Sequence, residues 1–458
     1  MEDTIAAIAT PPGAGGIGII RVSGPKSLDI ARLLFKSSKG DDAYRSHHLY
    51  HGDIISPETG TVIDEVLMAL MMKPHSYTGE DVLEINCHGG YVILQSVLSE
   101  VVKAGARLAE PGEFTRRAFL NNRIDLTQAE AIADMTTAKT DRGLALAVSH
   151  LKGNFAEKIE KIRTSIIDVL VSLETSIDFS DEDVEIFNPP ELAGKVEPII
   201  EELHQLALTY REGKIYRDGI HAVIAGRPNV GKSSLLNRLL GEKRAIVTPI
   251  PGTTRDFIEE IISIRGMPVT LTDTAGIREP ENIIEKEGIH LVWGKILQAD
   301  VVIVLLDGSE ALTDEDVEII KRSREKKYIL AVNKSDLPHT LDERKISAIV
   351  PDGDTPIWIS AKHGEGIPVL KDALFTRMLE HTDVRRLPHT VSNIRHKLAI
   401  EKTGDLLSRA KESILNNLSP EFSAFDVREA LHSLGEITGK TINEEVLDRI
   451  FSTFCIGK

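Results

Sequence analysis

The stretch Gly226-Arg-Pro-Asn-Val-Gly-Lys-Ser233 has the residue types and the spacing of a phosphate-binding loop. Its glycines let the backbone come close to a phosphate, and backbone amides at a helix N-terminus supply partial positive charge. We expect Lys232 to reach the β- and γ-phosphates of a nucleotide and the Ser233 hydroxyl to ligate Mg²⁺. A glycine-rich turn can match so short a pattern by chance, so the motifs that follow decide the interpretation.

Two further motifs supply groups for the metal ion and the γ-phosphate. Gly252-Thr-Thr-Arg-Asp256 offers a hydroxyl for Mg²⁺, and Thr254 is the favoured one. Asp273-Thr-Ala-Gly276 closes a predicted strand, so that Asp273 would hold Mg²⁺ through water and the Gly276 amide would contact the γ-phosphate.

The last two motifs choose the base. A carboxylate at Asp336, in Asn333-Lys-Ser-Asp336, can accept hydrogen bonds from the N1–H and N2 amino groups of guanine, which adenine lacks. Ser360-Ala-Lys362 adds a backbone amide for guanine O6. The five motifs in this order predict a GTP site. Its predicted members are Asn229, Val230, Gly231, Lys232, Ser233, Ser234, Thr248, Pro249, Ile250, Pro251, Gly252, Thr253, Thr254, Asp273, Thr274, Ala275, Gly276, Asn333, Lys334, Asp336, Ser360, Ala361 and Lys362.

The residues for the hydrolytic step are less ordinary. Ile277 stands where many regulatory GTPases carry a glutamine that orients water. Asn229 could ligate a monovalent cation together with carbonyls of residues 248–253, or it could only stabilise its own loop. Glu285 could organise water, although a glutamate in so acidic a stretch is also consistent with a solvated charge.

The elements that position these motifs alternate between strands and helices over residues 214–380. This alternation predicts a doubly wound parallel sheet, in which ligands bind at the carboxyl ends of the strands. A helix is expected over Ser234–Leu240. The predicted strands are Ile220–Ala225, Val269–Thr272, Val301–Leu306, Tyr328–Val332 and Pro356–Ile359.

Residues 1–118 predict a compact α/β unit with strands at Thr4–Ala9, Gly18–Val22 and Asp81–Asn86 and a helix at Tyr91–Gly105. The glycine-rich loop of residues 10–16 could cradle a ligand or form a plain turn. Four polar residues near the predicted element ends could contact a ligand or form surface salt bridges: Arg21, Glu84, His88 and Arg123.

Helical spacing of apolar residues dominates residues 119–213 and 381–458. Thr127-Gln-Ala-Glu130 predicts a capping box, Pro189-Pro190 predicts a break, and a helix is expected over Ala193–Arg211. The simplest multidomain α/β and α architecture is a discontinuous helical domain made of both segments, with the nucleotide domain inserted. The remaining expected helices are Ser392–Leu415, Phe425–Leu434 and Asn443–Phe451.

Composition limits the class of protein. The chain has 458 residues, two cysteines and a formal net charge of −16. Two cysteines suit a reducing cytoplasm, and we expect neither a signal peptide nor a membrane span. An acidic chain is not expected to hold RNA by charge alone. Cys455 lies close to Lys458 in the sequence and could be a catalytic thiol or a cysteine packed as a small apolar residue.

The chain as a whole resembles the MnmE (TrmE) family of tRNA-modification GTPases. The resemblance covers essentially the full length. Besides the phosphate loop and Gly252-Thr-Thr-Arg-Asp256, it rests on Thr10-Pro-Pro-Gly13, Arg21-Val-Ser-Gly24, Thr78-Gly-Glu-Asp81, His88-Gly-Gly90, Pro111-Gly-Glu-Phe114, Arg117-Ala-Phe-Leu120 and Cys455-Ile-Gly-Lys458.

The resemblance implies an N-terminal folate-binding domain that forms a homodimer, and a GTPase domain stimulated by K⁺. It implies a heterotetramer with the FAD-bearing flavoprotein MnmG (GidA) that modifies C5 of the wobble uridine of certain tRNAs. The implied one-carbon source is 5-formyl- or 5,10-methylene-tetrahydrofolate. An acidic chain need not bind tRNA tightly if the flavoprotein presents it.

The resemblance also implies roles for individual residues. Glu285 matches the water-positioning glutamate of the family, and Cys455 matches its terminal cysteine. The implied folate contacts are Arg21, Glu84, Arg123 and Lys458, with Arg123 standing where some members have lysine; the implied Mg²⁺ ligands are Ser233 and Thr254, and the implied K⁺ ligands are Asn229, Thr248, Ile250 and Thr253.

Two other functions share the motifs. A ribosome-assembly GTPase would have all five, but it would be expected to carry a basic RNA-binding module or a second GTPase domain, and the sequence offers neither. A folate-dependent transferase with a regulatory GTPase attached would act without the flavoprotein.

Overall fold

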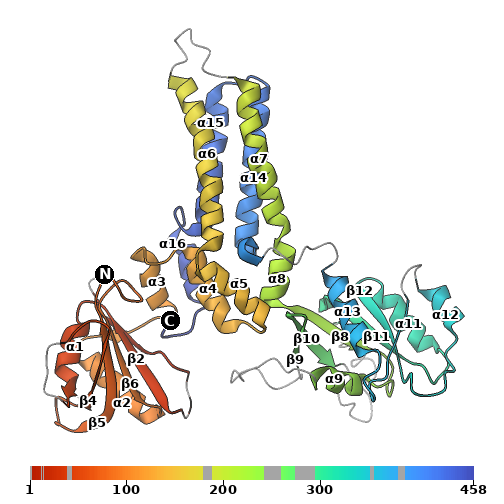
Figure 1. Cartoon of the computed structure of the whole chain (residues 1–458), viewed down its shortest axis with the longest axis horizontal. Coiled ribbons are helices and arrows are strands. Elements are labelled where there is room, and N and C mark those ends of the chain that lie inside the picture. The colour runs from red at the N-terminus through yellow and green to blue at the C-terminus, as the bar shows by residue number, and fades with distance from the viewer. Residues whose placement is uncertain are drawn as a thin grey trace. The chain divides into compact units, whose positions relative to one another are not determined.

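The computed structural model describes residues 3–11, 13, 15–38, 44–178, 188–241, 259–273, 294, 296–350, 355–379 and 387–458. The chain divides into two compact units, and Figure 1 labels their helices and strands. The first unit consists of Met1–Ala133, Leu151–Val171 and Val427–Lys458, and the second of Asp134–His150 and Ser172–Asp426.

A seven-stranded sheet organises the first unit, in the order β3-β4-β5-β6-β2-β1-β7. All neighbouring strands are antiparallel except β1 and β7. Alternate residues of β5 are buried, namely Val66, Met68 and Leu70, because successive side chains of a strand point to opposite faces. The strands are β1 (Ile5–Ile8), β2 (Ile17–Ser23), β3 (Phe35–Ser37), β4 (His48–Ile55), β5 (Val62–Met71), β6 (Val82–His88) and β7 (Arg107–Leu108).

Helices α1 (Ser27–Leu34) and α2 (Tyr91–Lys103) cover the core face of this sheet. The predicted strands near β1, β2 and β6 and the helix at α2 are confirmed, whereas β3, β4, β5 and β7 were not predicted.

In the first unit, residues near the end of the chain contact helices from the first half of the sequence. Leu126 of α4 (Leu126–Thr137) packs with Phe451 of α16 (Glu444–Phe451) and with Phe454. Lys440 Nζ lies 2.7 Å from a carboxylate oxygen of Glu160 in α6. Helix α3 (Glu113–Leu120) also lies in this unit, whereas α6 (Asn154–Asp178) and α15 (Pro420–Thr438) each belong partly to the second unit.

The predicted capping box at Thr127 is wrong by two residues. Gln128 N donates to Asp125 Oδ1 at 3.1 Å, and Asp125 N donates to Gln128 Oε1 at 2.9 Å. Asp125 therefore caps α4 reciprocally with Gln128, and Thr127 lies buried inside the helix.

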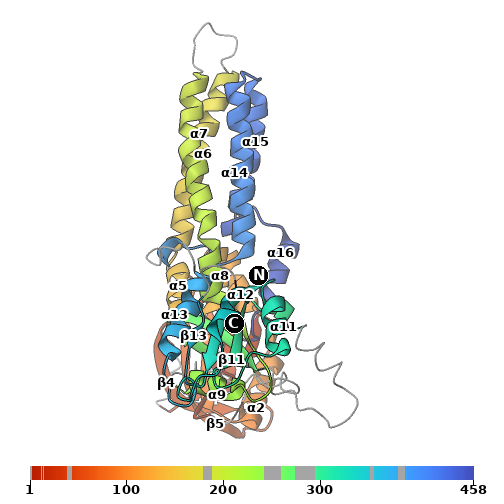
Figure 2. The same cartoon turned by 90° about the vertical axis from the view of Figure 1, so that its right-hand side faces the viewer.

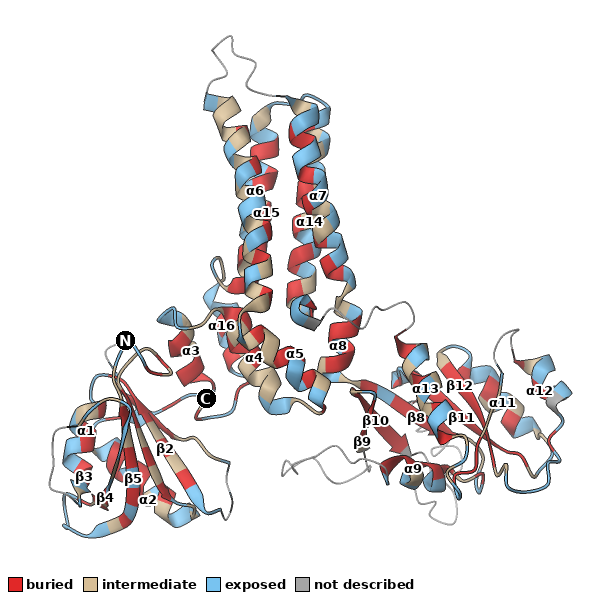
Figure 3. Cartoon of the chain, viewed as in Figure 1, coloured by how far each residue is buried: buried red, intermediate tan, exposed pale blue. Residues whose placement is uncertain are grey.

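A six-stranded sheet in the order β13-β12-β11-β8-β10-β9 lies in the second unit and is parallel except for β9. Every residue of β11 is buried, and Figure 3 shows the strand in red. Both faces of a parallel sheet are covered, so its strands read as continuous apolar runs. The strands are β8 (Ile220–Ala225), β9 (Glu259–Ile264), β10 (Met267–Asp273), β11 (Val301–Asp307), β12 (Lys327–Asn333) and β13 (Ile357–Trp358).

Helices cover this sheet on both faces, as predicted for a doubly wound fold. Ile303 of β11 packs in the cluster that contains α9 (Lys232–Leu240) and α13 (Ile367–Met378). Val304, the next residue, packs with α11 (Asp314–Ser323) and α12 (Glu343–Ile349).

Two long helices of the second unit, α7 (Pro189–Leu208) and α14 (Ile394–Leu415), pack along each other (Figure 2). The predicted helix at Ala193 begins earlier than expected, because Pro189 and Pro190 occupy its first turn, where proline needs no hydrogen-bond donor. The remaining elements are α5 (Asp141–Leu151), α8 (Tyr210–Asp218) and the 3₁₀ helix η2 (Leu387–His389).

Two segments that precede and follow the sheet in the sequence contact each other beside these helices. Val391 N donates to Thr209 Oγ1 at 2.9 Å. A Cβ on Gly213 would lie 2.1 Å from Val391 O, so only glycine fits at this crossing. Across the described part of the chain, no helix is both long enough and apolar enough to span a membrane.

Candidate functional site

The phosphate loop joins the end of β8 to the start of α9. Gly231 has a φ of +99°, and a Cβ there would lie 2.3 Å from Asn333 Nδ2. A Cβ on Gly226 would lie 2.4 Å from Leu305 O of β11. The two motif glycines are therefore required for the loop to lie against the neighbouring strands.

Lys232 closes this loop. Its side chain is largely buried, and Nζ donates to Gly226 O and to Arg227 O, each at 2.8 Å. The ammonium group is thus held across the loop, next to the backbone amides at the N-terminus of α9. A helix N-terminus with a fixed cation is suited to bind phosphate.

Asn333, the last residue of β12, ties the phosphate loop to the second base-recognition segment, Ser360-Ala-Lys362. Its side chain is 3% exposed, Nδ2 donates to Val230 O at 2.8 Å, and Oδ1 accepts from Ala361 N at 3.0 Å. One buried amide therefore sets the spacing between the phosphate loop and Ser360-Ala-Lys362.

Asp336 lies beside the same segment. Ser360 Oγ donates to Asp336 Oδ1 at 2.7 Å, and His363 Nε2 is 3.6 Å from Asp336 Oδ2. The hydrogen bond from Ser360 is the main cause of a lowered Asp336 pKa. The carboxylate is therefore ionised at neutral pH, which is the form that accepts the two donors of guanine.

Lys334 has a structural role in this segment. Its backbone has a φ of +66°, and its ammonium group pairs with the buried carboxylate of Asp307. Burial raises the pKa of Asp307, but hydrogen bonds from Lys334 and Ser309 outweigh that effect and lower it overall. The pair fixes the turn that follows β12.

Several predicted members of the nucleotide site lie outside the described residues. Asp273 ends β10 as predicted, but its side chain is not among those described. Ser233 and Ser234, in the first turn of α9, and Asn229, with a φ of +64°, are exposed. The members outside the described residues are Thr248, Pro249, Ile250, Pro251, Gly252, Thr253, Thr254, Thr274, Ala275, Gly276 and Glu285.

Ser233 and Asn229 are thus the only predicted Mg²⁺ and K⁺ ligands within the described part of the chain. A hydroxyl at the start of α9 and an exposed amide in the loop are oxygen donors, which suit these hard cations.

In the first unit, Arg21 joins the sheet to the end of the chain. Arg21 in β2 stands opposite Glu84 in β6, and Nε donates to Glu84 Oε1 at 2.8 Å. Nη1 donates to Gly457 O at 3.2 Å, and the guanidinium carbon is 5.2 Å from the centre of the Tyr77 ring and 5.8 Å from that of Phe114. One carboxylate, one backbone carbonyl and two aromatic faces therefore fix the orientation of this guanidinium group.

The terminal segment is held in place by backbone contacts. Gly457 has a φ of +93°, and a Cβ there would lie 2.6 Å from Ile8 O. Gly112 N donates to Cys455 O at 3.4 Å, and the Cys455 side chain is exposed. Lys458, the last residue, is half-buried next to Gly457.

Arg123 donates from Nε to Ser76 O at 3.2 Å, next in sequence to Tyr77. Sequence reasoning did not single out Tyr77, Phe114 or Gly457, although each lies in or beside a motif that was noted. His88 forms the surface salt bridge that was left open as an alternative, with Nδ1 2.7 Å from Asp64 Oδ1, and this hydrogen bond raises the His88 pKa.

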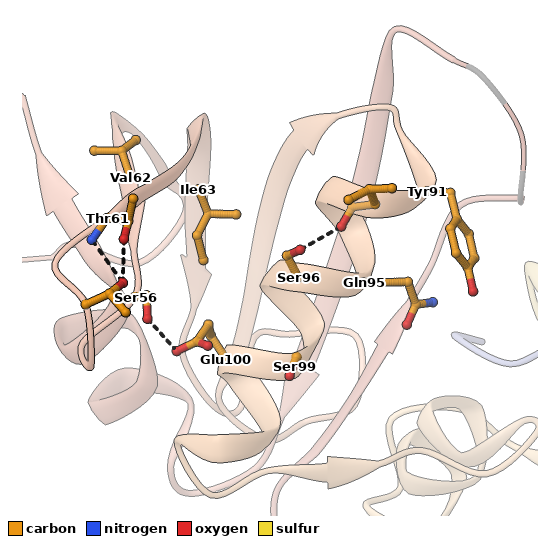
Figure 4. Close-up of a pocket in the computed structure, with 11 residues that line it drawn as sticks. Ser56, Thr61, Val62, Ile63, Tyr91, Gln95, Ser96, Ser99 and Glu100 are labelled. Atoms are coloured by element: carbon orange, nitrogen blue, oxygen red, sulfur yellow. Dashed lines mark hydrogen bonds between the residues drawn. The ribbon is translucent and has the colours of Figure 1, made fainter.

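A cavity of about 590 Å³ lies elsewhere on the first unit (Figure 4). Ser96 Oγ donates to Val92 O at 2.8 Å on its α2 side, and Ser56 Oγ donates to Glu100 Oε2 at 3.4 Å. None of the predicted site residues lines it. The lining residues are Ser56, Thr59, Thr61, Val62, Ile63, Tyr91, Val92, Gln95, Ser96, Ser99 and Glu100.

Two family models match successive parts of this chain. Residues 4–123 match the family described as GTP-binding protein TrmE N-terminus, and residues 126–455 match the MnmE helical domain. The tRNA modification GTPase MnmE of Syntrophus aciditrophicus (strain SB) is 56% identical over 458 residues, covering 100% of both chains. That of Natranaerobius thermophilus is 45% identical over 457 residues, again covering 100% of both.

Among solved structures, an Era variant of Aquifex aeolicus bound to GDP.AlF4⁻ is 26% identical, with a TM-score of 0.29, over 41% of this chain and 67% of that one. Both family matches and the full-length relatives lead to the same result: the chain belongs to the MnmE family, whose members named above are tRNA modification GTPases.

Proposed function

We propose that the chain is a K⁺-stimulated GTP hydrolase that acts in wobble-uridine modification of tRNA. It hydrolyses GTP to GDP and phosphate and, with the flavoprotein MnmG (GidA), modifies C5 of the wobble uridine using a tetrahydrofolate one-carbon unit. Full-length similarity to tRNA modification GTPases supports this proposal.

The observation that carries the GTPase part is the buried amide of Asn333. Its two hydrogen bonds, to Val230 O and from Ala361 N, bring the phosphate loop and the guanine-recognition segments into one site. Asp336 and Ser360 are paired at the same place. A triphosphate bound at Lys232 would extend its base towards this pair.

Ser233 and Thr254 would hold Mg²⁺, with Asp273 acting through water, and the ion would neutralise charge on the β- and γ-phosphates. The K⁺ ligands would be Asn229, Thr248, Ile250 and Thr253, and Glu285 would orient the attacking water. Asn229 would supply its amide oxygen, and its position in the phosphate loop is exposed.

For the one-carbon unit, the contacts would be Arg21, Glu84, Arg123 and Lys458. The salt bridge of Arg21 with Glu84 and its hydrogen bond to Gly457 O support this assignment, because they place an acid, a base and the terminal segment together. Such a set of donors and acceptors suits the polar edge of a pterin. The thiol of Cys455, exposed beside this cluster, would be the catalytic group of the terminal segment.

The proposed assembly is a homodimer joined to MnmG, which carries FAD, in a cytoplasmic heterotetramer that binds tRNA. The net charge of −16 favours shared binding of tRNA, since an acidic chain repels phosphate. The proposed domains are a folate-binding and dimerisation domain over 1–118, helical segments over 119–213 and 381–458, and the GTPase domain over 214–380.

Mass spectrometry of tRNA nucleosides from cells that lack this protein tests the proposal. We expect C5-modified wobble uridines to disappear, to return with the wild-type chain, and not to return with Lys232→Ala. Asn237→Ala, on an exposed position of the same helix, serves as the matched control and should restore the modification. Intact uridine modification with a ribosome-subunit defect would instead favour a ribosome-assembly GTPase.

A further inference from the structure

Arg227 is a charged residue of the phosphate loop to which the motif gives no role. Its side chain is 16% exposed. Nε donates to Asp316 Oδ1 at 2.9 Å, and Nη2 donates to Glu310 Oε2 at 3.1 Å. The guanidinium group thus joins the loop to α11 and to the segment that precedes it.

Asp316 is a fixed anchor for this ion pair. It is 2% exposed, and its Oδ2 accepts from Thr313 N at 3.0 Å and from Thr313 Oγ1 at 2.8 Å. Thr313 Oγ1 in turn accepts from Asp316 N, which completes a capping box at the start of α11. Both carboxylate oxygens are therefore used, one by the helix cap and one by Arg227.

The backbone of Arg227 is engaged on the other side. Its carbonyl oxygen accepts from Lys232 Nζ at 2.8 Å, as does the carbonyl oxygen of Gly226. Gly226 itself lies so close to Leu305 O that a Cβ would not fit. One residue therefore connects the cap of α11, through its side chain, to the phosphate-binding lysine, through its carbonyl.

We infer that Arg227 is a positioning residue for nucleotide binding, whose ion pair with Asp316 fixes the first turn of the phosphate loop and, with it, Lys232. The inference rests on the proposed binding of GTP at this loop. Arg227 acts through Lys232 and the loop backbone, which would surround the β-phosphate that GTP and GDP share.

This role predicts a separation between binding and hydrolysis. Loss of a hydrogen bond between charged groups changes an equilibrium by about ten- to a hundredfold. We therefore expect Arg227→Gln to weaken the affinities for both GTP and GDP, by about tenfold or more, and to raise KM with little change in kcat. Arg227→Lys keeps the charge but not the fork of donors, and should recover part of the loss.

The experiment uses the full-length chain and fluorescent GDP and GTP analogues, with kcat and KM measured in parallel. The variants are Arg227→Gln, Arg227→Lys, Asp316→Asn and the double variant Arg227→Gln with Asp316→Asn. Because the two partners act as one unit, the double variant should lose no more affinity than the worse single variant. Arg322→Gln removes an exposed ion pair with Glu318 on the same helix and should change neither affinity.

Unchanged GDP affinity in Arg227→Gln would overturn the inference, as would losses that add in the double variant or a fall in kcat at constant KM. If Asp316→Asn fails to fold because the cap of α11 is lost, the comparison of Arg227→Gln with Arg227→Lys still decides. Failure of the proposed function looks different: the wild-type chain would then not bind GTP, or Lys232→Ala would bind it equally well.

Discussion

Replacing Asn333 by alanine removes the buried amide that joins the phosphate loop to the base-recognition segment. The substitution deletes the hydrogen bond from Nδ2 to Val230 O and the one from Ala361 N to Oδ1. Val230 and Ala361 are themselves buried, at 1% and 4% exposure. Both backbone groups would therefore be left without this partner in a place that water reaches poorly.

The size of the effect follows from those two groups. An orphaned buried donor or acceptor costs about 1–3 kcal/mol, so the two together cost about 2–6 kcal/mol. The cost divides between the free energy of unfolding and the affinity for nucleotide. If about 2 kcal/mol falls on binding, GDP affinity drops about thirtyfold.

Urea unfolding followed by tryptophan fluorescence measures the first part, because both tryptophans, Trp293 and Trp358, belong to residues 214–380. Titration with a fluorescent GDP analogue measures the second. Asn237→Ala is the matched control, since it removes the same side chain from an exposed position on α9. Asn333→Asp keeps an acceptor for Ala361 N but turns a second oxygen towards Val230 O, and we expect it to be at least as harmful.

A combined loss below about 0.5 kcal/mol in Asn333→Ala would refute this reasoning, because that is the range of substitutions at ordinary surface sites. The same conclusion would follow if Asn237→Ala lost as much as Asn333→Ala.

Three further predictions concern Asp336, Gly457 and Glu113. Asp336→Asn should turn preference from GTP towards xanthosine triphosphate, by about 10⁴-fold in competition binding, because the new amide donates where guanine also donates; unchanged GTP affinity would count against this assignment. Gly457→Ala should weaken binding of 5-formyltetrahydrofolate in calorimetry, whereas Gly60→Ala, at a similar positive φ of +69° with nothing within 4 Å, should not. Burial raises the pKa of Glu113, but hydrogen bonds led by the one from Arg107 outweigh this effect and lower the pKa below 4.5. The ionised carboxylate should therefore stabilise the folded state above about pH 4.5, and this contribution should be lost as the pH falls through the lower, folded-state pKa. A Glu113→Gln variant whose urea midpoint showed the same acid dependence as the wild type would contradict this prediction.

The nucleotide-binding sheet was largely predictable because its signals are local. Continuous apolar runs predicted β8, β11 and β12, and the motifs follow β8, β10 and β12 directly. Position 231 requires glycine because of its positive φ and because Asn333 lies too close for a Cβ. Such a local requirement is visible in a short sequence motif. The sequence could therefore indicate which residues meet at the phosphate loop and beside Asp336.

The N-terminal sheet and the cluster of residues around Arg21 were harder to predict. Strands β4 and β5 pair with each other over most of their length, but no short motif marks that pairing. Arg21 and Gly457 are 436 residues apart, and their contact depends on how the whole first unit folds. Tyr77 and Phe114 both contact the guanidinium group of Arg21. Their spacing along the sequence gives no indication of this shared contact.

The pairing of α7 with α14 has a consequence for how the chain is made on the ribosome. Helix α14 begins about 185 residues after the end of α7, and the complete nucleotide-binding sheet lies between them in the sequence. At about 5–20 residues per second, roughly 10–40 s of synthesis separates the two helices. During that interval the apolar stripe of α7, which includes Leu192, Val196 and Leu203, has not yet met α14. The crossing of Thr209 with Val391 closes only at the end of that interval, so α7 stays open during this time to a chaperone that shields apolar helices.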